Sequence, residues 1–143
     1  MAYDSINSFV VVVHTKAPPT DEEWDEYIEF NRANGVERGV ITRYLVVTEG
    51  GAPTAAQRKL FHDAVTPLLQ KYPNVLRTAV VTPSTFVRGV MSALSLVNPI
   101  FRGFSPNEIN EAYEYLSVPS VYRGDLEELV ATLRASLKQP IYR

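Results

Sequence analysis

Apolar and polar residues follow two alternating patterns along the chain, one with the period of a strand and one with the period of a helix. Short runs rich in β-branched residues indicate buried strands. Such runs occur at 9–13, ending near Thr15, and at 39–48 and 75–82, and a shorter strand is predicted at 100–104. Each is followed by a segment whose apolar residues recur every three or four positions, the spacing of an amphipathic helix. The pattern predicts a strand followed by a helix four times, and one further helix near the C-terminus.

Hydroxyl and acidic residues indicate where the predicted helices begin, because they satisfy the free N–H groups of a first turn. The predicted helix starts are Thr20 with Glu23, Thr54 with Gln57, Ser84, Ser105 with Glu108, and Asp125 with Glu128. Gly35 is predicted to end the first helix. Pro67 falls inside the second helical pattern and is predicted to kink or split it.

The alternation of strands and helices is typical of an α/β fold with a mostly parallel sheet and helices packed against it. The 143 residues suit one domain, with a sheet of four or five strands, a core from about 7 to 137 and a loose tail at 138–143. Six strand residues are predicted to be buried in this sheet: Val11, Val13, Leu45, Val47, Ala79 and Val81.

Composition narrows the classes of function. The net charge is -2, with 14 basic and 16 acidic residues and no basic block, which excludes a typical nucleic-acid-binding surface. The chain has no cysteine, so we expect neither a disulfide framework nor a thiolate site. The apolar run at 9–13 is too short to span a membrane, and the N-terminal "MAYDSINS" lacks the positive charge of a signal peptide. We therefore expect a cytoplasmic protein.

The turns between strands and helices are the candidate binding sites, because parallel strands bring them to one edge of the sheet. They lie at 48–54, 82–85 and 103–105, and each offers a helix N-terminus that could bind an anion, with Arg58, Arg88 and Arg102 as added charge. The alternative is that their hydroxyl residues only cap helices. The candidate ligand- or partner-binding residues are Thr48, Gly50, Gly51, Thr54, Ser84, Phe86, Arg88 and Met91.

The "EGGA" turn at 49–52 matches neither a Walker loop nor the dinucleotide fingerprint, so its glycines are predicted to provide a positive φ. Catalytic groupings are also scarce. His62 stands beside Asp63, but adjacent helix positions point in different directions, and no spacing gives His14 or His62 further metal ligands. Ser92 and Ser95 have no G-x-S-x-G elbow. We expect no catalytic residue, no metal and no cofactor.

The segment "FVRGVMSALSLVNPIFRGF" at 86–104 is apolar nearly all round, interrupted by Arg88 and Arg102. It fits a helix buried between the sheet and the terminal helix. It also fits a ligand cavity or a surface for a partner. Periodicity leaves these alternatives open.

Three segments, "VVTEGGAPTAAQRK", "RTAVVTPSTFVRGVMSAL" and "IFRGFSPNEINEAYEYL", together resemble the STAS (sulfate transporter and anti-sigma factor antagonist) domain. The similarity covers about 39–118 and is greatest to the bacterial branch related to CRAL-TRIO lipid-binding modules. It implies a non-enzymatic regulatory module, in which a partner kinase phosphorylates a Ser or Thr at the position of Thr54. The chain departs from that switch pattern, because Pro53 replaces an acid and Ala55 and Ala56 follow. Only one clear strand precedes the first helix, where many STAS domains have two.

The expected function is therefore a protein-interaction module in bacterial signalling, with a homodimer left open. The alternative is a small binding protein for an apolar, lipid-like ligand or an anionic one; an enzyme acting through His14 or His62 is the third choice. On the expectation that Arg88 is solvated near a helix start, Arg88→Glu should weaken binding and leave the fold intact.

Overall fold

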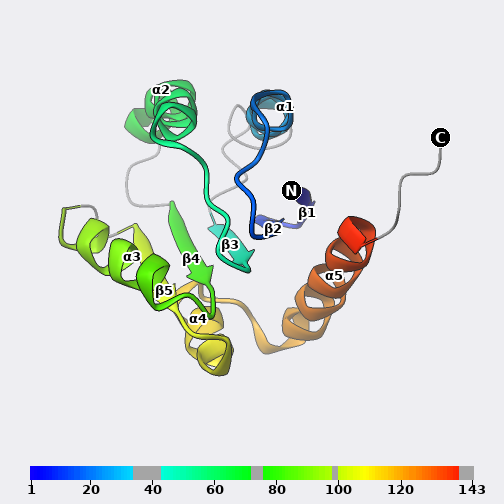
Figure 1. The fold of residues 1–143 in the computed structure, drawn as a ribbon. Helices are drawn as coiled ribbons and strands as arrows, with labels where there is room; N and C mark the ends of the chain where they lie inside the picture. Colours follow the sequence, from blue (N-terminus) through cyan, green and yellow to red (C-terminus); the bar gives the residue numbers. More distant parts are fainter. Residues whose placement is uncertain (34–42, 72–75, 98–99, 139–143) are drawn as a thin grey trace.

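The computed structural model describes residues 1–33, 43–71, 76–97 and 100–138, which form a five-stranded sheet with helices on both faces (Figure 1). The elements, in chain order, are β1 (Ala2–Ile6), β2 (Phe9–His14), α1 (Asp21–Asn31), β3 (Arg43–Thr48), α2 (Ala55–Lys71), β4 (Arg77–Val81), α3 (Thr85–Val97), β5 (Phe101–Phe104), the 3-10 turn η2 (Pro106–Glu108), α4 (Ile109–Tyr115) and α5 (Ser120–Lys138).

The strands lie in the sheet in the order of the sequence, β1-β2-β3-β4-β5. The strands β2 to β5 are parallel, and β1 is antiparallel to β2, with Ala2 opposite Val13. The predicted mostly parallel sheet of four or five strands is therefore confirmed. Parallel pairing places the C-terminal ends of β2, β3, β4 and β5, and the turns that follow them, at the same edge of the sheet.

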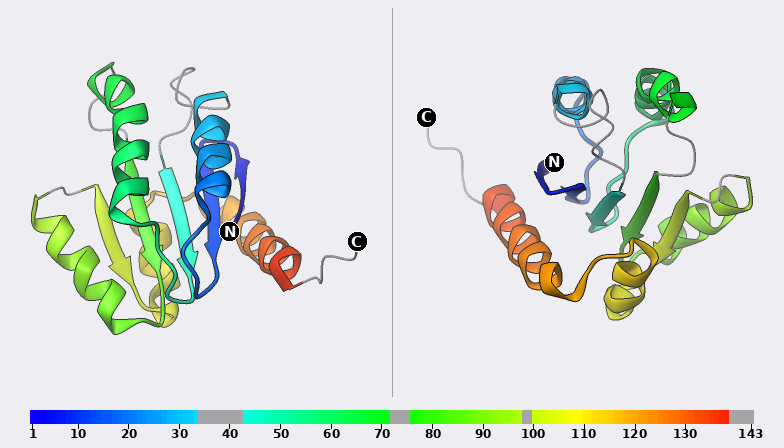
Figure 2. Two further views of the ribbon diagram at one scale, coloured as in Figure 1. Left: turned by 45° about the horizontal axis from the view of Figure 1, so that its top comes forward. Right: turned by 180° about the vertical axis from the view of Figure 1, so that it is seen from behind.

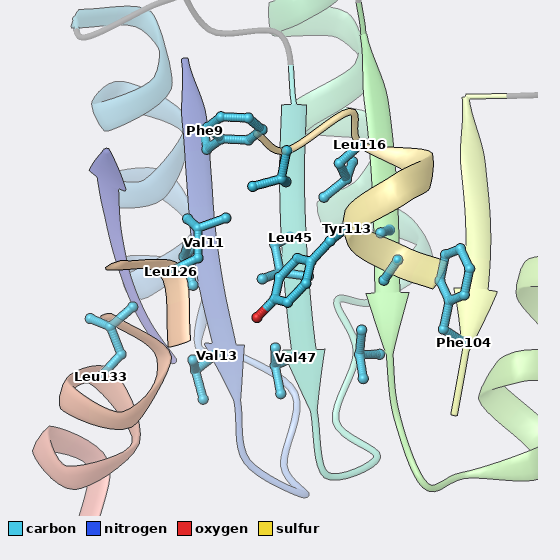
Figure 3. Packing of buried hydrophobic residues seen from close by; sticks show 14 residues of the cluster. Phe9, Val11, Val13, Leu45, Val47, Phe104, Tyr113, Leu116, Leu126 and Leu133 are labelled. Carbon is cyan, nitrogen blue, oxygen red and sulfur yellow. The ribbon is translucent and has the colours of Figure 1, made fainter. Parts of the chain in front are cut away.

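Alternating residues of the central strands face two separate cores. On one face, Val10 and Val12 pack with the aromatic residues Trp24 and Tyr27 of α1. On the other face, α4 and α5 cover the cluster shown in Figure 3, where Tyr113 and Leu126 are buried. All six strand residues predicted to be buried are buried, as a strand covered on both faces requires. The helix α3 lies beside β5 at one end of the sheet, and α5 lies against β1 and β2 at the other (Figure 2).

The first strand was not predicted, and the core was expected to begin only at about residue 7. Two strands precede α1, because β1 turns back onto β2 through a two-residue hairpin in which Asn7 has a φ of 51°. The side chains of β1 are mostly half-buried, with Asp4 exposed, so the segment lacks the apolar run that marks the other strands.

Other predicted features differ from the structure or lie outside the described residues. The helix α2 continues through Pro67 and is therefore not split there; the alternative, a kink at Pro67, stays a prediction. The helix α5 begins at Ser120 and continues through Gly124, so the predicted helix start at Asp125 is wrong. The predicted end of the first helix at Gly35, the strand residues 39–42 and the tail from 139 onward lie outside the described residues.

Candidate functional site

The turn after β3 contains three of the predicted site residues and is bonded to the end of β2. The Thr48 hydroxyl donates to the Gly51 carbonyl at 2.5 Å and accepts the Gly50 N–H at 3.1 Å. Gly50 has a φ of 128°, which confirms the predicted positive φ for this residue; Gly51 has no positive φ, so the prediction is wrong there. The Gly51 N–H donates to the Thr15 carbonyl at 2.9 Å. These bonds join the turn to the loop that follows β2.

The first turn of α2 is occupied by its own cap. The Thr54 hydroxyl accepts the Gln57 N–H at 3.2 Å, and the Gln57 side-chain oxygen accepts the Thr54 N–H at 2.9 Å. The buried Gln57 amide also donates to the Pro19 carbonyl at 2.9 Å and to Asp21 at 3.0 Å. The predicted capping box is confirmed, and the Gln57 amide in addition joins the start of α2 to the start of α1. The Thr54 side chain is exposed, and its phosphorylation stays a prediction.

Thr54→Ala is expected to lower the free energy of unfolding by about 1 kcal/mol, because the Gln57 N–H loses its cap. Urea unfolding measures this loss. Thr54→Ser keeps the hydroxyl and should stay within about 0.5 kcal/mol of the wild type. Equal losses in the two variants would contradict a capping role.

In the turn after β4, the hydroxyl groups are likewise bonded to the backbone of the turn and of the helix that follows. The buried Thr82 hydroxyl accepts the Ser84 N–H at 3.1 Å, and the Ser84 hydroxyl accepts the Val87 N–H at 3.2 Å, which confirms Ser84 as a cap. Arg88 is half-buried, and its guanidinium donates to the Thr82 carbonyl at 2.8 Å. The expectation that Arg88 is solvated is therefore wrong. This hydrogen bond joins α3 to the end of β4.

Arg88→Glu is accordingly expected to destabilise the fold by about 2 kcal/mol, since a charge-assisted bond is lost and a carboxylate is set beside a carbonyl oxygen. The matched charge reversal Arg134→Glu, at an exposed position of α5, should cost less than about 0.5 kcal/mol. Thermal unfolding of both variants provides the comparison. A melting curve for Arg88→Glu that matches that of Arg134→Glu would show that the Thr82 contact contributes nothing.

The other candidate arginines are bound near their own turns. The Arg58 side chain donates to the Pro53 carbonyl at 2.9 Å. The Arg102 guanidinium lies over the Phe104 ring, 5.2 Å from its centroid. Each cation thus has a local partner.

The two histidines lie in different environments. His14 is buried at the end of β2, its Nδ1 has no hydrogen-bond partner, and burial together with the N-terminal ammonium lowers its pKa to about 4. His62 is exposed on α2, with Nδ1 3.6 Å from Asp63, so the expectation that these adjacent side chains diverge is wrong. Within the ranges described above, no group of three or more histidine and acidic side chains could hold a metal ion, and no helix is long and apolar enough to cross a membrane.

The helix α3 exposes large apolar side chains on the side turned to solvent, unlike an ordinary surface helix. Its protein-facing residues are half-buried at most: Val87, Arg88, Met91 and Ser95. Met91 lies against Gly103 of β5, where an added Cβ would approach the Met91 Cβ to 3.0 Å. The exposed apolar and small residues of this helix are here termed the outward face of α3: Phe86, Gly89, Val90, Ala93, Leu94, Leu96 and Val97. The exposed polar residues Thr85 and Ser92 lie beside this face.

The exposure on this face is large. Phe86, Leu96 and Val97 are 79%, 89% and 87% exposed. The interpretation of the segment as a helix buried between the sheet and the terminal helix is therefore wrong. Phe86 and Met91, which were placed together in one candidate site, lie on opposite sides of α3. The sequence did identify the apolar segment, but hydrophobic periodicity cannot tell which side of a helix faces the protein.

No protein-family model matches this chain, and no curated protein and no solved structure matches it either. The resemblance to STAS domains therefore stays a prediction.

Proposed function

We propose that this chain is a non-enzymatic, STAS-like protein-interaction module of bacterial cytoplasmic signalling, and that the outward face of α3 is its docking surface. The observation that carries the proposal is the exposure of this face. Monomeric proteins rarely expose contiguous apolar patches larger than a few hundred Å², and the largest patch on a protein is often functional. Here five large apolar side chains of one helix are exposed: Phe86, Val90, Leu94, Leu96 and Val97.

A protein partner fits this geometry better than an enclosed apolar ligand. A ligand held between the sheet and the helices would need the apolar side of α3 to face β5. Instead, the side nearest the sheet is mixed, with Arg88 and Ser95 beside two apolar residues. The most exposed apolar side chains, including Phe86 and Leu96, face outward. A second protein can cover the outward face without any change in the fold.

The turns at the carboxyl edge support a structural role rather than an anion site. The hydroxyls of Thr48, Thr54 and Ser84 are each bonded to the backbone of their own turn or helix. A phosphate placed at these helix starts would compete with those bonds. We infer that the turns orient the helices, including α3, and that the partner is recognised by α3.

Affinity capture from the native cells tests this proposal. A tagged wild-type chain is compared with tagged Phe86→Ser/Leu96→Ser, which removes two exposed apolar groups of the outward face. The matched control is Val121→Ser, which changes a 75% exposed valine of α5. We expect proteins, whether other chains or untagged copies of this one, to be retained by the wild type and the control and lost from the double variant. Equal retention by all three would contradict the proposal.

A further inference from the structure

We propose that Arg43 and Arg77 form a binding site for a phosphate-type dianion. The site lies at the amino edge of the sheet, where the parallel strands begin, and thus opposite the turns of the carboxyl edge. It is built from β3, β4 and the end of α4 rather than from α3. The inference therefore does not rest on the proposed function.

The two arginines are neighbours in the sheet. Arg43 is the first residue of β3 and Arg77 the first of β4, and the two are paired in register. Neighbouring strands lie about 4.8 Å apart, and residues two apart on a strand share one face. Leu45 and Ala79, two positions further along, belong to the core beneath α4 and α5. Arg43 and Arg77 therefore extend side by side from that same face.

The charges of these two arginines have no acidic partner among the described residues. None of the ion pairs in this part of the chain includes Arg43 or Arg77. Like charges at paired positions of neighbouring strands destabilise a sheet. A bound anion would remove this repulsion, because it would lie between two cations that otherwise face each other uncompensated.

Arg43 also lacks a hydrogen-bond acceptor. The residue is half-buried, and its Nε is a buried atom with no partner among the described residues. Buried polar atoms in folded proteins are nearly always bonded, so an exception needs an explanation. An anion beside the guanidinium would provide the acceptor that the surrounding protein does not.

Arg77 is oriented before any ligand arrives. Its guanidinium donates to the Tyr115 carbonyl at 2.9 Å and lies over the Tyr115 ring, 5.7 Å from the centroid. These contacts use only part of a guanidinium that has five N–H donors. Because the side chain is exposed, the other donors can reach a ligand. A side chain held in place in this way loses less conformational entropy on binding.

The chemistry of the pair favours phosphate over a single carboxylate. Two guanidinium groups carry two positive charges, which a dianion neutralises and a carboxylate does not. The planar guanidinium also matches two oxygens of one phosphate group. A nucleic-acid strand fits less well, since it requires basic residues along an extended surface, and the chain has a net charge of -2.

An NMR titration with inorganic phosphate tests the site, in a buffer alkaline enough to keep the phosphate doubly charged. Sodium chloride holds the ionic strength constant, because screening alone would weaken the repulsion. The Arg43 Nε–H signal should shift and saturate. Arg43→Gln and Arg77→Gln should each weaken binding at least about tenfold, since each removes a charge-assisted hydrogen bond. Arg134→Gln, at an exposed position of α5, should bind like the wild type.

Thermal unfolding adds a result that a merely structural arginine would not give. Without phosphate, Arg43→Gln should melt no lower than Arg134→Gln, because it removes one of two charges that repel each other. Phosphate should raise the melting temperature of the wild type and of Arg134→Gln, since a ligand of the folded state stabilises it. It should leave that of Arg43→Gln nearly unchanged.

Three outcomes would overturn the inference. The first is an Arg43 signal that does not move with phosphate, or binding that is equal in the wild type and both glutamine variants at the site. The second is acetate binding as tightly as phosphate, which rules out a site for a dianion. The third is a phosphate-free Arg43→Gln that melts well below Arg134→Gln, which shows that Arg43 stabilises the fold instead of carrying an uncompensated charge.

Discussion

Acidifying the protein from pH 7 to pH 5 is expected to lower its free energy of unfolding by about 2 kcal/mol through His14. Burial lowers the pKa of this imidazole from 6.5 to about 4 in the folded state. Below pH 6.5 the unfolded chain therefore binds a proton that the folded chain does not. The stability contributed by the neutral imidazole is complete above pH 6.5 and is lost as the pH falls towards 4.

Carboxyl groups that titrate at lower pH set the lower limit of the pH range in which the effect of His14 can be measured. Glu23 is near His14, and its pKa is held below 4.5 mainly by a hydrogen bond from the Thr20 N–H. Its contribution is lost mostly below pH 4.5, so the interval from pH 6.5 to pH 5 isolates the histidine.

Urea unfolding at several pH values in this interval measures the effect. His14→Leu should remove most of the pH dependence, because no buried imidazole remains. His62→Gln should leave it intact, since His62 is exposed on α2. A wild-type stability that is flat between pH 7 and pH 5 would contradict the burial of a neutral His14.

Gly51→Ala is expected to destabilise the fold by about 3 kcal/mol. An added Cβ would collide with the carbonyl oxygens of Thr15 and Ala17, and both are backbone atoms that cannot rotate away. The same substitution would also disturb the bond from the Gly51 N–H to Thr15. The loops after β2 and β3 would therefore have to move apart, and the hydrogen bond between them would break.

Gly124→Ala is the matched control for this change. Gly124 lies inside α5, where an added Cβ meets nothing within 4 Å, so the substitution should stabilise the protein by about 0.5–1 kcal/mol. Thermal unfolding compares the two. If Gly51→Ala melts like the wild type, the two loops do not pack as tightly as described.

Most of the fold could be predicted because its signals are local. β-branched runs indicated β2 to β4, and the capping boxes at Thr20 and Thr54 located two helix starts. The first strand has no such run, and it is held mainly by pairing with β2. The last helix was predicted to begin at Asp125 because Asp125 and Glu128 have the spacing of a cap. The helix α5 begins earlier, at Ser120, since its packing against β1 and β2 outweighs the cost of Gly124 inside it.

The candidate site could be predicted only in part, because the contacts and the exposure of its side chains depend on tertiary packing. The hydroxyls of Thr54 and Ser84 were recognised as caps, and the structure confirms them in that role. The position of Arg88 on α3 was known, but its bond to the Thr82 carbonyl requires the end of β4 to lie beside it. The same packing decides that α3 presents its apolar side outward, which no periodicity reveals.

The central claim is that the outward face of α3 is covered by a protein in the cell. Photo-crosslinking tests it most directly, with benzoylphenylalanine in place of Phe86 in the native cells, and in place of the similarly exposed Val121 as the reference position. We expect discrete protein adducts at position 86 that are missing at position 121, and mass spectrometry distinguishes a second copy of this chain from another protein. Irradiation that leaves the chain unlinked at position 86, or that gives the same adducts at both positions, would contradict the claim.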